Sequence, residues 1–130
     1  MQIKENTTHA IQILRYLHKN QGLQTAQNVA DAVGITAPLF KRIAMWLKQE
    51  NLITHIAGRD GGYTLGRPAE EISFYDVFWL TKGELYPNNH CAKRDINCEG
   101  ENHCKLHQFI KITEHFIIED MLGTSIADLA

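Results

Sequence analysis

The sequence has few of the features that mark membrane, secreted or disordered chains. No apolar run approaches the roughly 18 to 20 residues that span a bilayer, and the first residues lack the basic start and apolar stretch of a signal peptide. Only three of the 130 residues are proline, and only three are cysteine, an odd number that argues against a disulfide framework. We therefore expect a cytoplasmic protein that does not enter a membrane.

The composition is that of one folded domain, too small for a large multidomain enzyme. Hydrophobic residues make up 44% of the chain and charged residues 22%. Residues 1–67 carry eight basic and four acidic side chains, a balance of +4, whereas residues 68–130 carry five and eleven, a balance of −6. A basic first half favours contact with a polyanion, with plain charge scatter as the alternative.

The first half of the chain has the pattern of three helices. Apolar residues recur at helical spacing over residues 7–19. Thr25 is a typical N-cap for a second helix that ends at Gly34, and Thr36 can cap a third that runs to about residue 50. This spacing predicts a helix-turn-helix.

A short hairpin follows these helices. Residues 52–57 and 62–65 are expected to be strands, joined by a glycine-bounded turn at residues 58–61. The order of elements predicts a mainly α fold with a small β-hairpin, which is a winged helix-turn-helix.

The second half combines a short helix, an irregular segment and a long helix. Ser73 and Asp76 form a weak capping box, and residues 81–103 lack periodicity, which is typical of a functional or disordered loop. Residues 104–122 are apolar on two sides, so we expect a C-terminal dimerisation helix. The predicted division is a winged helix-turn-helix domain at 1–82, an irregular loop at 83–103, and a dimerisation helix with the C-terminal segment at 104–130.

Six residues are candidates for contact with DNA. A helix-turn-helix places the start of its second helix in the major groove, while the wing lies over an adjacent minor groove or phosphates. The alternative is that the three helices only pack together and the basic residues form a solvated face. The candidates are Thr36, Ala37, Pro38, Lys41, Arg42 and, at the tip of the wing, Arg59.

Three cysteines and a histidine form a second constellation. Three thiolates and an imidazole within a short segment are donors of metal-binding type. The set is Cys91, Cys98, Cys104 and His107, with His90 and His103 as further candidates. Zinc, or three unrelated free thiols, are the alternatives. Cys104 as an enzyme nucleophile is disfavoured because no oxyanion-hole or substrate loop is recognisable, so we expect no enzymatic activity.

Several motifs resemble a known family along nearly the whole chain. They are the first helix from His9 to Leu17, the turn from Val33 to Thr36, the wing from Gly61 to Leu65, the stretch from Ile72 to Val77, the cysteine segment, and the closing stretch from Thr124 to Leu129. Their order and spacing are similar to the Rrf-type (IscR/NsrR-like) family of bacterial winged-helix transcription regulators.

The resemblance implies a homodimer that binds a palindromic DNA operator, often as a repressor. It also implies that an iron-sulfur cluster on the three cysteines controls operator affinity and senses redox state, nitric oxide, or iron and cluster supply. By position, His107 matches the histidine that completes a 2Fe-2S site in IscR-like members. A 4Fe-4S cluster is the alternative.

This chain departs from the family pattern at several positions. Thr8 stands where NsrR-like members place a carboxylate ligand, which favours His107, and Glu5 with His9 could substitute from the partner chain. Ala57 and Lys41 replace an arginine and an acidic residue of IscR-like members, so the operator sequence should differ.

Two mechanisms remain open at this point. In the first, a cluster orders the loop and thereby fixes the separation of the two recognition helices. In the second, the same DNA-binding fold uses its cysteines as a cluster-free thiol redox switch or as a structural zinc site.

Overall fold

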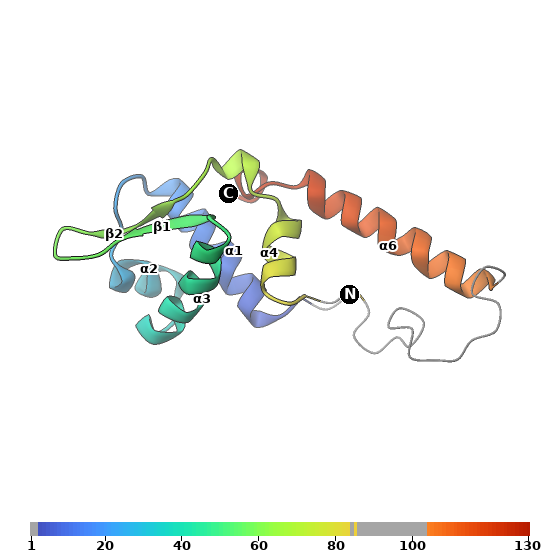
Figure 1. Ribbon diagram of the computed structural model, residues 1–130, viewed down its shortest axis with the longest axis horizontal. Coiled ribbons are helices and arrows are strands. Elements are labelled where there is room, and N and C mark those ends of the chain that lie inside the picture. Colours follow the sequence, from blue (N-terminus) through green and yellow to red (C-terminus); the bar gives the residue numbers. More distant parts are fainter. Residues whose placement is uncertain (1–2, 84, 86–103) are drawn as a thin grey trace.

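The computed structural model describes residues 3–83, 85 and 104–130, and these form a winged helix-turn-helix followed by a long helix (Figure 1). The predicted fold class, mainly α with a small hairpin, is confirmed. The elements are α1 (Glu5–Lys19), α2 (Ala26–Val33), α3 (Ala37–Gln49), β1 (Ile53–Ile56), β2 (Gly62–Leu65), the 3-10 turn η1 (Ala69–Glu71), α4 (Phe74–Leu80), α6 (Lys105–Gly123) and α7 (Ile126–Leu129).

Helix ends in the first half follow the predicted capping residues. The hydroxyl of Thr25 accepts a hydrogen bond from the backbone N–H of Asn28 at 3.1 Å, and Gly34 ends α2 with a φ of 83°. The hydroxyl of Thr36 accepts from the N–H of Leu39 at 3.3 Å. These local bonds fix the turn between α2 and α3 and hence the start of α3.

The predicted start of the first helix was wrong by two residues. The helix begins at Glu5, and Thr7 is fully buried within its first turn. The Thr7 hydroxyl lies 2.6 Å from that of Thr81 at the end of α4. The side chain of Thr7, which the sequence placed at the start of the helix, is therefore bonded to a residue far along the chain.

The wing is a two-stranded antiparallel hairpin. Ile53 pairs with Leu65 and Ile56 with Gly62, so the first strand is one residue shorter at each end than predicted. Tyr63 also exchanges two backbone hydrogen bonds with Gln24, at 2.8 and 2.9 Å. This bridge attaches the hairpin to the segment that precedes α2.

The end of the chain returns to the core of the winged domain. The N–H of Ile126 donates to the carbonyl of Ile72 at 2.8 Å, and the N–H of Phe74 donates to the carbonyl of Thr124 at 2.7 Å. Ile126 is fully buried in the same cluster as the apolar faces of α1 and α3. The helix α7 therefore packs as part of the winged domain, which we call the head, although Ile126 lies 45 residues beyond Thr81 in the sequence.

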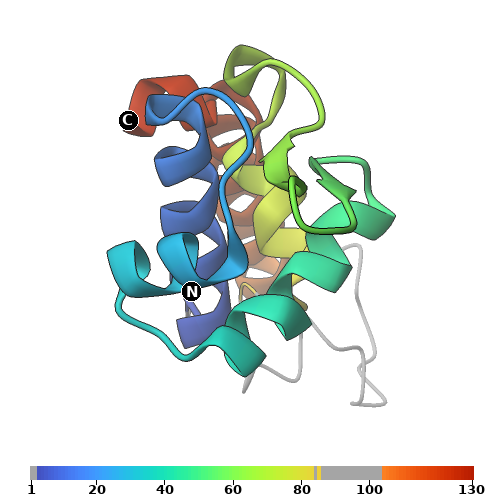
Figure 2. The same ribbon diagram turned by 90° about the vertical axis from the view of Figure 1, so that its left-hand side faces the viewer.

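The helix α6 extends away from the end that carries α2, α3 and the hairpin (Figure 1). Figure 2 looks onto that end, and there α6 lies behind the winged domain. Its main contacts are with α4, and only Ile110 and Met121 among its residues are buried. In the part of the chain that the structure covers, no helix is long and apolar enough to cross a membrane.

Candidate nucleic-acid interface and cysteine segment

The start of α3 presents polar and basic side chains to solvent. Thr36, Pro38, Lys41 and Arg42 are exposed, as the sequence predicted for a recognition helix. Ala37 is an exception, because its methyl group is half-buried and packs against the core. Ala37 therefore presents less surface for contact with DNA than the other candidates on α3.

Arg42 has an aromatic neighbour that sequence reasoning missed. Its guanidinium carbon lies 5.9 Å from the ring centroid of Trp46, one turn further along α3. A cation over an aromatic face is attracted by the ring quadrupole, and the i, i+4 spacing would have been the signal for this contact. The contact directs the guanidinium along the helix and away from its first turn.

Arg59 lies in a turn whose shape depends on glycine. Gly58 has a φ of 107°, and the N–H of Gly61 donates to the carbonyl of Gly58 at 3.2 Å. A Cβ on Gly61 would overlap the carbonyl oxygen of Ile56. The turn, which forms the far end of the hairpin in Figure 1, is therefore tight, and Arg59 within it is exposed.

The cysteine segment is described only at its end. Cys104 is the half-buried N-cap residue of α6, in extended conformation, and His107 lies in the first helical turn, partly buried. Cys91, Cys98, His90 and His103 lie outside the described residues. Within residues 3–83, 85 and 104–130, no three His, Cys, Asp or Glu side chains form a group that could hold a metal ion.

Glu5 and His9, the alternative ligands on α1, lie close to each other. Nε2 of His9 lies 3.9 Å from a carboxylate oxygen of Glu5, which is an ion pair when the histidine is protonated. Nδ1 of His9 is buried and has no hydrogen-bond partner among the residues placed here. Thr8 is exposed on the same turn.

A buried hydroxyl pair joins the start of α1 to the end of α4. Oγ1 of Thr81 also donates to the carbonyl of Val77 at 2.8 Å, so it accepts the hydrogen bond from Thr7. Nζ of Lys4 donates to the carbonyl of Lys82 at 2.6 Å. This junction stands directly before the segment that leads to the cysteines.

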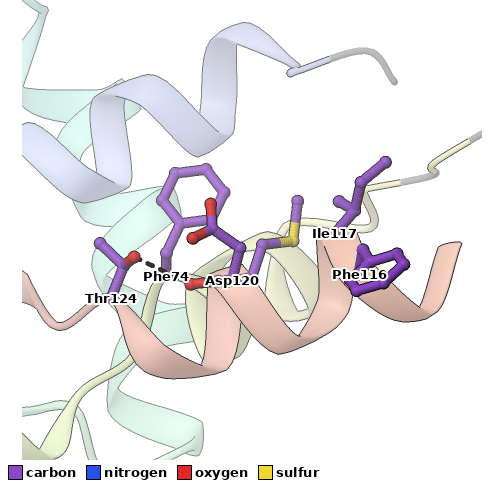
Figure 3. Close-up of a pocket in the computed structure, with 6 residues that line it drawn as sticks. Phe74, Phe116, Ile117, Asp120 and Thr124 are labelled. Atoms are coloured by element: carbon purple, nitrogen blue, oxygen red, sulfur yellow. Dashed lines mark hydrogen bonds between the residues drawn. The ribbon is translucent and has the colours of Figure 1, made fainter. Parts of the chain in front are cut away.

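A cleft of about 410 Å³ lies between α4 and α6 (Figure 3). Its walls are mostly apolar, and the hydroxyl of Thr124 closes one end by donating to the backbone carbonyl of Asp120 at 2.8 Å. The lining residues are Phe74, Phe116, Ile117, Asp120, Met121 and Thr124.

A three-helix head, a hairpin wing and exposed basic side chains on both define a winged-helix DNA-binding protein. The family model Rrf2, described as an iron-dependent transcriptional regulator, matches residues 3–130. The chain therefore belongs to the Rrf2 family of transcription regulators, and it is not an enzyme.

Relatives agree over most of their length. Protein aau3 of Rhizobium meliloti (strain 1021) is 27% identical over 130 residues, covering 99% of this chain and 84% of its own. The HTH-type transcriptional regulator NsrR of Oceanobacillus iheyensis is 25% identical over 138 residues, covering 94% and 90%. The solved structure of CymR, the global cysteine regulator of B. subtilis, matches with a TM-score of 0.79 at 21% identity, over 100% of this chain and 96% of that one.

Proposed function

We propose that this regulator binds a palindromic operator as a homodimer, and that the chemical state of its cysteine segment sets its affinity for that operator. The observation that carries the proposal is the place of Cys104 at the N-cap of α6. The same helix carries half of the large apolar side chains that are exposed among the described residues. A change at the cysteine is therefore a change at the start of the proposed dimer helix.

The exposed surface of α6 supports a dimer. Phe116 is 69% exposed and Phe109 66%, and Leu106, Ile112 and Leu122 are also exposed. Apolar surface of this extent on one helix is typical of an interface. The cleft beside Phe116, shown in Figure 3, would receive side chains from the second copy.

The charges of α6 support an antiparallel pairing with its copy. Residues 105–113 carry two lysines and no acid, whereas residues 114–123 carry two glutamates and one aspartate. An antiparallel pair places the basic half of each helix against the acidic half of the other, and a parallel pair places like charges together.

On the DNA side, each head would insert the start of α3 into the major groove. We assign base and backbone contacts to Thr36, Ala37, Pro38, Lys41 and Arg42, and a minor-groove or phosphate contact to Arg59. A dimer engages two half-sites about one helical turn, roughly 34 Å, apart. The spacing between the two heads therefore decides whether both half-sites are bound.

A path of direct contacts runs from α6, which begins after Cys104, to the recognition helix α3. The helix α6 packs on α4, the end of α4 bonds to α1 through Thr81 and Thr7, and α1 packs on α3. Ligation of Cys104 would fix the start of α6, and the packed helices would carry that constraint to the position of the head.

The donor set fits an iron-sulfur cluster, with 2Fe-2S favoured. Cys91, Cys98, Cys104 and His107 would hold it, and the bound cluster would supply reversible electron transfer and exchange of a labile ligand. A neutral imidazole from His107 in place of a thiolate leaves the site less negative, which raises its potential. Nitric oxide, redox state and iron or cluster supply are the signals such a site could sense.

A second candidate keeps the DNA binding and removes the cluster. The likeness to CymR, the global cysteine regulator of B. subtilis, favours a thiol switch in which oxidation of the cysteines moves the heads. A structural zinc site on the same residues is the other form of this candidate.

The division of the chain follows from the same account. We propose a DNA-binding domain at 1–82, a ligand-binding loop at 83–103 and a dimerisation helix from 104, with α7 completing the core of the DNA-binding domain. The assignment to the cytoplasm rests on the proposed contact with an operator.

Anaerobic purification separates these candidates. We expect brown protein with visible absorption, with iron and sulfide in equal amounts, and with an absorption band that changes in His107→Ala. Colourless protein loaded with zinc, or colourless protein whose operator binding changes on thiol oxidation, would support the second candidate. Colourless protein indifferent to zinc and oxidants would contradict both.

A further inference from the structure

A row of three aromatic rings joins the recognition helix to the wing. The ring of Phe40 on α3 meets the ring of Tyr63 edge-on, with 4.9 Å between centroids and 85° between planes. The ring of His55 lies flat on Tyr63, at 4.2 Å and 11°. Phe40 is fully buried and His55 is exposed, so the row runs from the core to the surface of the hairpin.

The stack on Tyr63 supports the outer part of β1. After Ile53, every residue of β1 is exposed, so this part of the strand depends on its pairing with β2 and on the ring of His55. His55 and Tyr63 face each other directly across the two strands. Cross-strand aromatic pairs of this kind stabilise a sheet beyond their buried area.

Tyr63 is the fixed member of the pair. Its backbone exchanges two hydrogen bonds with Gln24, and its ring lies between Phe40 and His55. Burial raises the pKa of the Tyr63 phenol, so the ring beneath His55 stays uncharged at neutral pH. His55 is thus held against a surface that belongs to the core.

We propose that His55 is a positioning residue, which by stacking on Tyr63 sets the angle of the wing and so places Arg59 against the DNA. This inference rests on the proposed DNA contact of Arg59. The four residues from His55 to Arg59 span at most about 13 Å, so a tilt of about 10° at His55 would move the tip by up to about 2 Å. Such a displacement is enough to break a hydrogen bond from a guanidinium to a phosphate.

Because the turn is tight, the angle of the strands determines the position of Arg59. Gly61 lies against the backbone of Ile56, with no room for a Cβ, and the positive φ of Gly58 restricts that position to glycine. A turn with so little freedom transmits a tilt of the strands to Arg59 instead of absorbing it.

A thermodynamic cycle tests the proposal. The probe is a DNA duplex selected from a randomised pool by the wild-type protein, and the variants are His55→Ala, Arg59→Ala, the double variant and His55→Phe. We expect Arg59→Ala to weaken binding about tenfold and His55→Ala about fivefold. In the Arg59→Ala background, His55→Ala should add less than about twofold, because the residue it positions is gone. His55→Phe, which keeps the stack, should bind within about twofold of wild type.

The outcomes distinguish failure of this inference from failure of the proposed function. Two results would show that His55 acts on DNA by itself and would overturn the inference. One is the same fivefold loss of affinity from His55→Ala in the Arg59→Ala background, and the other is an equal loss of affinity in His55→Phe and His55→Ala. An unchanged affinity in His55→Ala, beside a weakened Arg59→Ala, would overturn it as well. An unchanged affinity in Arg59→Ala would overturn both this inference and the wing contact. Thermal unfolding of each variant checks that the exposed substitution leaves the fold intact.

Discussion

At the scale of single residues, Arg42 is directed along α3 by its contact with Trp46. The guanidinium therefore points away from the first turn of the helix, which is the part of a recognition helix that meets base edges. We infer that Arg42 contacts a phosphate, and that Lys41 is the residue of this turn with access to a base.

This assignment predicts the behaviour of Arg42→Ala. Operator affinity should fall about tenfold, and by a similar factor on every operator sequence. The slope of log affinity against log salt concentration should decrease in magnitude by about one. Binding titrations at several salt concentrations measure both. The control is Lys19→Ala, which removes the same charge from the exposed end of α1. A loss confined to one base position would show that Arg42 reads a base instead.

A second prediction concerns the buried hydroxyls of Thr7 and Thr81. Thr81→Val leaves the Thr7 hydroxyl buried without its partner, which should cost about 1–3 kcal/mol of unfolding free energy. The double variant Thr7→Val with Thr81→Val should recover most of that loss, because no polar group is then left unpaired. Denaturant unfolding measures the cycle, and simple addition of the two single effects would contradict the account.

At the scale of elements, α7 is fixed by a capping box. The Ser125 N–H donates to Asp128 at 2.9 Å, and the Asp128 N–H donates to the Ser125 hydroxyl at 3.1 Å. Hydrogen bonds from the backbone and side chain of Ser125 lower the pKa of Asp128. This helix carries Ile126 into the core, so the box connects an exposed carboxylate to the packing of the head.

The lowered pKa predicts the sign of a pH effect. A carboxylate with a lower pKa in the folded state adds stability above its unfolded pKa, about 3.9, and loses that contribution as the pH falls towards the folded value. Asp128→Asn should therefore be less stable than wild type at pH 6, and the difference should shrink towards pH 3. Thermal unfolding across this range measures it, with Asp60→Asn in the wing turn as control. A difference that grows on acidification would contradict the sign.

Features that depend on hydrogen bonds between near neighbours in the chain could be predicted from the sequence. Features that depend on distant residues could not. The caps at Thr25, Thr36 and Ser73 depend on residues three positions away, and all three are confirmed. The burial of Thr7 and of Ile126 depends on partners far along the chain, which periodicity does not reveal.

The candidate site divides in the same way. Exposed positions on α3 followed from helical spacing, whereas the packing of Ala37 against the core and the stack of His55 on Tyr63 depend on tertiary contacts and on the strand register. Ligation by the cysteines remains a prediction, because two of the three lie outside the described residues.

At the scale of the whole molecule, a winged head and a partly uncovered helix lie at opposite ends (Figure 1). The sequence predicted two parts with different roles, through the opposite charges of its two halves and the two apolar sides of the last long helix, but it did not predict that they lie at opposite ends. In the proposed dimer, the winged domains would contact the operator and the two copies of α6 would set the distance between them.

The proposed dimer predicts the effect of a charge on α6. Phe116→Asp places a carboxylate in the exposed apolar face and beside the cleft, so it should convert the dimer into a folded monomer and weaken operator binding by more than tenfold. Light scattering with size exclusion measures the mass. Ile56→Asp, an equally polar change at an exposed apolar residue of the wing, should leave the mass unchanged. Equal masses of wild type and Phe116→Asp would refute pairing through this face.

The most direct test of the central claim compares the operator affinity of one protein preparation before and after the cluster or metal ion is removed from, or loaded onto, its cysteine segment. A coupling of ordinary size changes affinity between about 5- and 150-fold, and we expect a change in this range for wild type. Cys104→Ala should remove most of that change while keeping the affinity of one of the two states. Identical affinities of filled and emptied wild-type protein, at fixed salt and with the dimer intact, would contradict the account.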